Sequence, residues 1–186
     1  MPILRQFAQL GHPVLRQKAR EVEDPAGPRV QALIADMLYT LADFGGQGLA
    51  APQVHEPLRI IIIASHCSPF YPDAPAMEPT VMLNPVLVRA HGSMVKGWEG
   101  CKSVPGIRAL VPRWECADVR YQDPSGQWKE LALPGFPARI FQHELDHLEG
   151  LCFLDRIEST GDIVMEQELA REMKKGRPVL SAEFSR

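Results

Sequence analysis

The stretch PARIFQHELDHLEG, residues 137–150, contains the sequence HELDH at positions 143–147. Pro137 and Gly150 are typical start and stop signals, so we predict a helix over residues 137–149. Residues four apart lie on the same face of a helix, with Cβ atoms within about 6 Å of each other. His143 and His147 are therefore predicted to bind one metal ion.

Glu144 is the candidate acid–base residue of the HELDH motif. Next to the first histidine, it can reach a water molecule at the metal and accept its proton. With 6 His and 23 Asp plus Glu in 186 residues, chance gives about 0.02 matches to HExxH. The alternative, a coincidental motif on a solvent-exposed helix, is disfavoured by this number and by an apolar side at Leu145, Leu148 and Leu151.

Two histidines leave such a site one ligand short, since a catalytic metal usually takes three protein ligands and keeps a position for water. No histidine follows His147. Cys101, in the sequence EGCKS at residues 99–103, is the strongest candidate, because glycine allows close approach of the backbone and a thiolate is a good metal ligand. Four downstream acidic residues remain alternatives: Glu149, Asp155, Glu158 and Asp162.

A third segment, GQGLAAPQ at residues 46–53, follows a predicted helix directly. Its backbone amides could meet a peptide, and the Gln53 side chain could donate to a developing oxyanion. Taken alone, the segment is better explained as a helix C-cap followed by a turn, because a GxG loop is weak evidence for a binding site. It lacks the GK[ST] of a phosphate loop and the later glycine and acid of a dinucleotide site.

The rest of the chain predicts an α+β fold with mostly antiparallel pairing, in a single domain spanning residues 1–186. Apolar residues at helical spacing predict a helix over residues 27–44. The proline-rich segment 65–79 is predicted to be an irregular loop, and a C-terminal helix is predicted at about 162–175. Short strands are predicted at 58–64, 80–83, 86–90, 93–98, 107–111, 117–122 and 127–133.

Composition excludes several classes of function. The formal net charge is −3, which gives no electrostatic footprint for nucleic acid or for a membrane surface. No apolar run approaches the roughly 20 residues of a membrane span. The N-terminal residues lack the apolar core of a secretory signal, so we expect a cytoplasmic protein without direct sequence-specific nucleic-acid binding.

Together the three segments resemble the motifs of the peptide deformylase family, which are GxGLAAxQ, EGCxS and HExDH in that order. The chain has them at residues 46–53, 99–103 and 143–147. Flanking stretches are similar as well, so the resemblance covers most of residues 3–157. The SVPG and GFPARIFQHELDH stretches most resemble the branch shared by some proteobacteria and organelles.

The resemblance implies antiparallel sheets around the HExDH helix, and an enzyme that removes the formyl group from the N-terminal formyl-methionine of new polypeptides. It implies one divalent metal ion, Fe²⁺ in the cell with Zn²⁺, Ni²⁺ or Co²⁺ as substitutes, bound by Cys101, His143 and His147. Glu144 would shuttle the proton. Nascent formyl-methionyl peptides are the expected partners, and the ribosome is a further candidate.

The resemblance also implies residues that meet the substrate. The Gln53 side chain and the backbone amide of Lys102 would hold the formyl oxyanion, and the methionine side chain would occupy an apolar pocket. The residues expected to bind substrate are Gly46, Gly48, Leu49, Glu99, Gly100, Phe136 and Ile140.

This chain departs from the family pattern at Lys102, usually leucine, and at His55, usually glycine. If the Lys102 ammonium faces the substrate groove, it must either be desolvated or reach water along its flexible stem. Its charge could instead lower the pKa of a metal-bound water and draw in an acidic substrate. We judge desolvation the larger effect for formyl-methionine peptides and expect Lys102→Leu to raise kcat/KM for formyl-Met-Ala-Ser. We also expect Asp146 to pair with Arg113 and so to tie the catalytic helix to the neighbouring strand.

Two other functions remain open at this stage. A metallopeptidase that cuts internal peptide bonds would share the HExxH motif, although Cys101 as a ligand disfavours it. A deformylase-like metal-binding protein, with activity reduced or altered by Lys102, would share the fold. Formate release from formyl-Met-Ala-Ser, compared with cleavage of casein by the same metal-replete sample, distinguishes the three.

Overall fold

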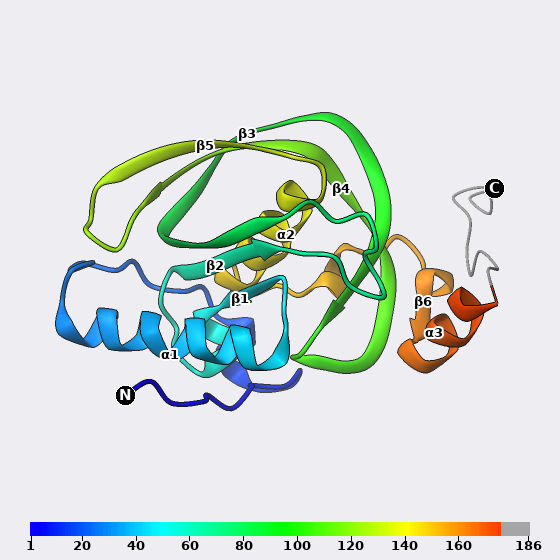
Figure 1. Ribbon diagram of the computed structural model, residues 1–186, viewed down its shortest axis with the longest axis horizontal. Helices are drawn as coiled ribbons and strands as arrows, with labels where there is room; N and C mark the ends of the chain where they lie inside the picture. Colours follow the sequence, from blue (N-terminus) through cyan, green and yellow to red (C-terminus); the bar gives the residue numbers. More distant parts are fainter. Residues whose placement is uncertain (176–186) are drawn as a thin grey trace.

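The computed structural model describes residues 1–175, which form one antiparallel sheet and three α-helices (Figure 1). The sheet order is β1-β2-β3-β4-β5, with β6 paired to β4, and every strand pair is antiparallel. The predicted α+β class is thereby confirmed. The elements are α1 (Pro28–Phe44), β1 (Gly48–Ala50), β2 (Ile60–Ser65), β3 (Met77–Cys101), β4 (Val104–Gln122), β5 (Trp128–Pro134), α2 (Gly135–Leu148), β6 (Ile163–Met165) and α3 (Glu166–Lys174).

Strand β2 is buried on both faces because helices cover both. Side chains alternate across a strand, and Ile61 and Ile63 accordingly pack in the cluster that contains Phe141 of α2. Ile60 and Ile62 pack on the opposite face, in the cluster that contains Met37 of α1. Figure 1 shows the result: α1 runs along the outside of β1 and β2, and α2 lies inside the arc of the sheet.

The short strands predicted between residues 80 and 98 are one long strand, β3. Its pairing with β4 shifts register between Leu83 and Val86, between Leu87 and Arg89, and between His91 and Met94. Such β-bulges bend a strand without ending it. The predicted breaks therefore mark bulges, and the predicted loop 65–79 ends earlier, where β3 starts at Met77.

Strands β3 and β4 form a hairpin whose tip carries the EGCKS sequence. Cys101 pairs with Val104, so Lys102 and Ser103 make the turn. The corresponding strand predictions at 107–111 and 117–122 fall within the single strand β4. This hairpin curves around α2 (Figure 1), and its tip is brought beside the helix that carries HELDH.

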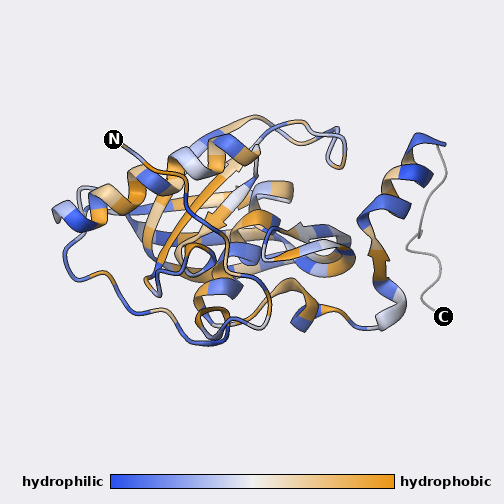
Figure 2. Cartoon of the chain, turned by 90° about the horizontal axis from the view of Figure 1, so that it is seen from below, coloured by the Kyte–Doolittle hydropathy of each residue, from blue (hydrophilic) through white to orange (hydrophobic). Residues whose placement is uncertain are grey.

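The C-terminal helix is shorter than predicted. Residues 160–162 form a 3₁₀ turn and Ile163–Met165 form β6, which pairs with Ile107–Ala109 of β4, so α3 begins at Glu166. Figure 2 shows α3 as a largely hydrophilic helix set apart from the body of the fold. No helix among residues 1–175 is long and apolar enough to cross a membrane.

Helix α2 is held on the sheet by a buried guanidinium. Arg113 of β4 donates to Asp146 Oδ2 of α2 at 2.6 Å and makes two bonds to Glu99 of β3, at 2.9 and 3.0 Å. Arg113 is 5% exposed, so these bonds form away from water. The predicted Asp146–Arg113 pair is confirmed.

We expect Arg113→Met to lower the free energy of unfolding by about 3 kcal/mol, because it leaves two buried carboxylates short of a partner. In this variant Arg139 still pairs with Glu99, and Arg156 still pairs with Asp146. The expected loss of stability is therefore at the lower end of the range for breaking a buried ion pair. Urea unfolding of metal-matched samples measures it. The control is Arg89→Met, an exposed cation of β3; equal midpoints for the two variants would contradict the prediction.

Candidate active site

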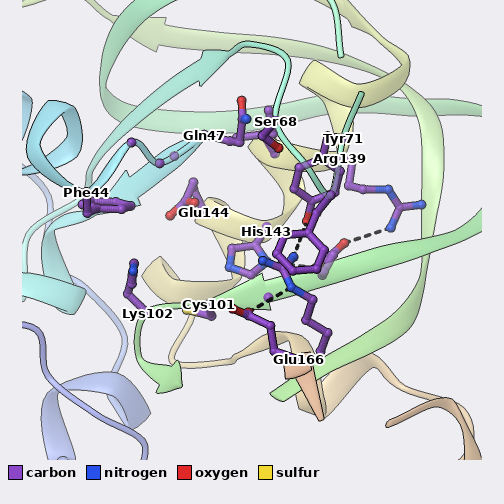
Figure 3. Close-up of a pocket in the computed structure, with 18 of the residues that line it drawn as sticks. Phe44, Gln47, Ser68, Tyr71, Cys101, Lys102, Arg139, His143, Glu144 and Glu166 are labelled. Atoms are coloured by element: carbon purple, nitrogen blue, oxygen red, sulfur yellow. Dashed lines mark hydrogen bonds and ion pairs between the residues drawn. The ribbon is translucent and has the colours of Figure 1, made fainter. Parts of the chain in front are cut away.

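The three motif segments line one cavity of about 480 Å³. The GQGLAAPQ segment contributes Gly46, Gly48 and Gln53, the β3–β4 hairpin contributes residues 99–102, and α2 contributes His143 and Glu144. Segments nearly a hundred residues apart in sequence thus meet at one place. Figure 3 shows Cys101, His143 and Glu144 beside one another, with Phe44 and Lys102 at one side of the cavity and Glu166 at the other.

Cys101, His143 and His147 form the group of potential metal ligands. Their ligand atoms all lie within 4.8 Å of one another, and Cys101 Sγ is 3.3 Å from His147 Nε2. His147 is fully buried, and its Nδ1 atom has no hydrogen-bond partner among residues 1–175. Sulfur and two imidazoles at this spacing suit a tetrahedral metal ion with one position left open.

Neighbouring residues fix the orientation of these side chains. Glu99 Oε2 accepts a hydrogen bond of 2.8 Å from His143 Nδ1, which leaves Nε2 available. Gln53 Nε2 donates to Cys101 Sγ at 3.2 Å, while its Oε1 accepts from the Ala50 amide at 2.8 Å. Although burial raises it, His147 and His143 lower the pKa of the Cys101 thiol well below its ordinary value, which favours the ligating thiolate.

Glu144 is buried beside this group and forms no hydrogen bond with its three side chains. Its Oε2 atom has no hydrogen-bond partner in the part of the chain that the structure describes, and its side chain lines the cavity. Burial raises the pKa of Glu144 to about 7, against the charges of His143 and His147, which lower it. A carboxyl group with such a pKa can both accept and release a proton near neutral pH.

The residues expected to bind substrate fall into two groups. Gly46, Gly48, Gly100, Phe136 and Ile140 line the cavity. Leu49 does not: its side chain is fully buried in the cluster against α1, so only its backbone remains for substrate.

Glu99 lines the cavity too, but both of its oxygens are occupied. Oε1 accepts from Arg113 and Arg139, each at 2.9 Å, and Oε2 accepts from Arg113 and His143. Burial opposes ionisation, yet His143 and Arg113 hold the pKa of Glu99 well below its ordinary value. The arrangement favours a role in orienting His143 over direct contact with substrate.

Several cavity residues were not among those expected. Tyr71 lies against Phe136, with ring centroids 4.5 Å apart, and donates to the Trp98 carbonyl at 3.1 Å. Arg108 stacks on Phe70 at 3.6 Å, donates to the Tyr71 hydroxyl at 3.2 Å and pairs with Glu166 at 3.0 Å. Residues 68–71 of the predicted loop therefore form a wall of the cavity.

Sequence reasoning could have identified one further cavity residue, Arg139. Arg139 is four residues before His143, hence on the same helix face, and it reaches Glu99 and the Val111 carbonyl. No pattern pointed to the others, since their place depends on the path of the loop and on the pairing of β6 with β4.

The backbone conformation at His55 explains why the family pattern has glycine there, and nothing in the structure explains the histidine. His55 follows the 3₁₀ turn Ala51–Val54 and adopts φ 67°, in the left-handed region, where a glycine is at ease and a side chain is disfavoured. Its ring makes an edge contact with His12, with centroids 4.7 Å apart. Both rings are exposed, and neither lines the cavity.

The alternative acidic ligands are engaged elsewhere. Glu149 pairs with Lys18 and Arg59, and Asp155 pairs with Arg16. Glu158 and Asp162 both pair with Lys96. Within residues 1–175, the one group of three potential ligands is that of Cys101 and the two histidines.

Comparison with known proteins agrees with this geometry. The family model of Polypeptide deformylase matches residues 4–162. Peptide deformylase 2 of a Nostoc species is 49% identical over 167 residues, which is 90% of this chain and 93% of that protein. Peptide deformylase 2 of Shewanella oneidensis is 45% identical and covers 87% of this chain and 89% of its own length.

Solved structures give the same result for the fold. The class I type b peptide deformylase from Acinetobacter baumannii, solved with Met-Ala-Ser bound, superposes with a TM-score of 0.82 at 40% identity, over 84% of this chain and all of that one. The deformylase of Synechococcus elongatus, solved with actinonin, gives 0.75 at 35% identity over 94% and 87%. The chain therefore belongs to the polypeptide deformylase family.

Proposed function

We propose that the cavity hydrolyses the formyl amide of N-formyl-methionyl polypeptides, giving formate and a free N-terminal amine. The chain is a peptide deformylase, a metal-dependent hydrolase of this family. The observation that carries the proposal is the position of Glu144 beside the group of Cys101, His143 and His147. Glu144 is buried there, and its Oε2 atom has no hydrogen-bond partner within residues 1–175. That combination is suited to activating water for attack on an amide carbonyl.

Cys101, His143 and His147 are the residues that would hold the metal ion. When bound, a divalent cation acts as a Lewis acid and makes water acidic enough to be deprotonated near neutral pH. A thiolate with two imidazoles accommodates Fe²⁺ and Zn²⁺ alike, and we propose Fe²⁺ as the ion in the cell because the resemblance to the family implies it.

Glu144 moves the proton. Its carboxylate accepts a proton from the attacking water as the oxygen bonds to the formyl carbon. It then delivers that proton to the amide nitrogen as the carbon–nitrogen bond breaks. The raised pKa of Glu144 suits both halves of this transfer, because the group exchanges a proton at little cost near pH 7.

Two donors are available for the oxygen that becomes negative. Gln53 Nε2 points at Cys101 Sγ, so it lies next to the reacting centre and has a second hydrogen to donate. The Lys102 amide belongs to the residue that follows Cys101. Phe136 and Ile140, with Tyr71 against Phe136, offer an apolar surface for the methionine side chain.

Partners and location follow from this chemistry. The substrates are formyl-methionyl nascent chains, and their synthesis places the enzyme in the cytoplasm, near the ribosome. A metallopeptidase acting on internal bonds is disfavoured, because the matching family model and the similar proteins are peptide deformylases.

Glu144→Gln should retain one metal ion per chain and reduce formate release from formyl-Met-Ala-Ser by about 10²- to 10⁴-fold, the usual contribution of a positioned acid–base group. Cys101→Ala should lose the ion. Metal analysis and anaerobic turnover on the same samples test both statements. Loss of metal in Glu144→Gln with retention in Cys101→Ala would reverse the assignment, and casein cleavage without formate release would exclude deformylation.

Gly48 makes room for Glu144. A Cβ atom at Gly48 would collide with the Glu144 carboxylate and lie 2.9 Å from its Cγ atom. We expect Gly48→Ala to displace the carboxylate and to reduce kcat at least 10-fold with metal content unchanged. Gly161→Ala, whose new Cβ would meet only Ser159 Oγ at 3.3 Å, is the control.

A double-mutant cycle identifies the route of the effect. If Gly48→Ala acts through Glu144, adding it to Glu144→Gln should cause little further loss of kcat. Additive losses would show that Gly48 serves the substrate instead.

A further inference from the structure

The cavity contains three lysine or arginine side chains, and two of them are neutralised. Arg108 pairs with Glu166 at 3.0 Å, and Arg139 pairs with Glu99 at 2.9 Å. Lys102 is the third, and no carboxylate of residues 1–175 forms an ion pair with it. Among the described residues, Lys102 is thus the one lysine or arginine of the cavity without a carboxylate partner, and it lies on the wall opposite Glu166 (Figure 3).

The Lys102 side chain stands at the rim of the cavity. It is exposed, and its Nζ atom lies 5.6 Å from the centroid of the Phe44 ring. Lys102 belongs to the turn of the β3–β4 hairpin, whereas Phe44 ends α1, so the side chain reaches across between two elements. Contact with an aromatic face holds an ammonium group without removing its charge.

The same residue is close to the reacting centre through its backbone. Lys102 follows the proposed ligand Cys101, and its amide is a proposed donor to the formyl oxygen. A substrate bound there must leave the cavity past the rim, and two extended residues span about 7 Å. A flexible lysine side chain is of similar length, so it can meet the side chain of either residue after the methionine.

We propose that Lys102 makes this enzyme select formyl-methionyl peptides with an aspartate or glutamate in the two positions after the methionine. This rests on the deformylase activity proposed above. The carboxylate pairs with the Lys102 ammonium while the formyl group lies at Cys101. Because the pair forms at an exposed rim, it contributes a preference of about 2- to 5-fold, the range of solvent-exposed ion pairs.

The structure also changes the expectation for Lys102→Leu. An increase in kcat/KM was expected if the ammonium had to be desolvated, but the exposed side chain keeps its contact with water. Lys102 is then expected to raise kcat/KM for peptides with a free C-terminal carboxylate, such as formyl-Met-Ala-Ser. Substrates for the test must therefore carry a C-terminal amide.

The test compares kcat/KM for amidated formyl-Met-Glu-Ser, formyl-Met-Gln-Ser and formyl-Met-Lys-Ser, with a second set that varies the third residue. Wild type with a full complement of metal should favour glutamate over glutamine by about 2- to 5-fold in at least one set, and disfavour lysine. In 1 M salt the preference should fall toward one, because the Debye length shortens from about 10 to about 3 Å.

Variants then locate the preference. The glutamate-to-glutamine ratio should fall to about one in Lys102→Met and below one in Lys102→Glu. Each ratio is taken within one variant, so any common change in the chemical step cancels. Arg89→Met removes the same charge from an exposed site outside the cavity and should keep the wild-type ratio.

Three results would overturn the inference. They are a wild-type ratio near one in both peptide sets, a ratio unchanged in Lys102→Met, or a ratio that falls equally in Arg89→Met, which would indicate net charge alone. Failure of the proposed function looks different: no formate would be released from any of the peptides by metal-loaded protein.

Discussion

The geometry of the site depends on how α2 packs against the β3–β4 hairpin, and the guanidinium of Arg113 fixes that packing. The proposed metal ligands come from both elements, Cys101 from β3 and the two histidines from α2, so their spacing is only as good as the packing between them. Arg113 of β4 bonds to Glu99 on β3 and to Asp146 on α2. Away from water such charge-assisted bonds are strong and directional, and Glu99 passes the constraint on to the His143 ring.

Sequence reasoning succeeded where the information is local or belongs to a motif. The i, i+4 spacing of His143 and His147 places both on one helix face whatever the rest of the chain does. Cys101 was reached by a different route, from the missing third ligand. The continuous apolar run of β2 and the helical periodicity of α1 are equally local, and both elements lie close to where they were expected.

Features set by tertiary contacts were out of reach. Bulges keep β3 continuous through positions that resemble strand ends, because pairing with β4 supplies hydrogen bonds on both sides of each irregularity. Glu166 reaches the cavity because β6 pairs with β4, a contact that no local pattern encodes. The glycine at position 48 was weak evidence in the sequence, and its reason is visible only once Glu144 is seen against it.

Glu99 and Glu144 show how one cavity gives two carboxylates different tasks. Both are buried, at 3% and 4% exposure, so desolvation disfavours the charge of each. Glu99 is surrounded by Arg113, Arg139 and His143 and stays ionised. Burial raises the pKa of Glu144 to about 7, and no residue of the described part of the chain donates a hydrogen bond to its Oε2 atom. Separation of their pKa values by environment makes the first a fixed support and the second a proton carrier. Arg113 and Arg139 therefore stabilise the fold and also keep Glu99 ionised, which leaves Glu144 as the carboxyl group that can transfer a proton.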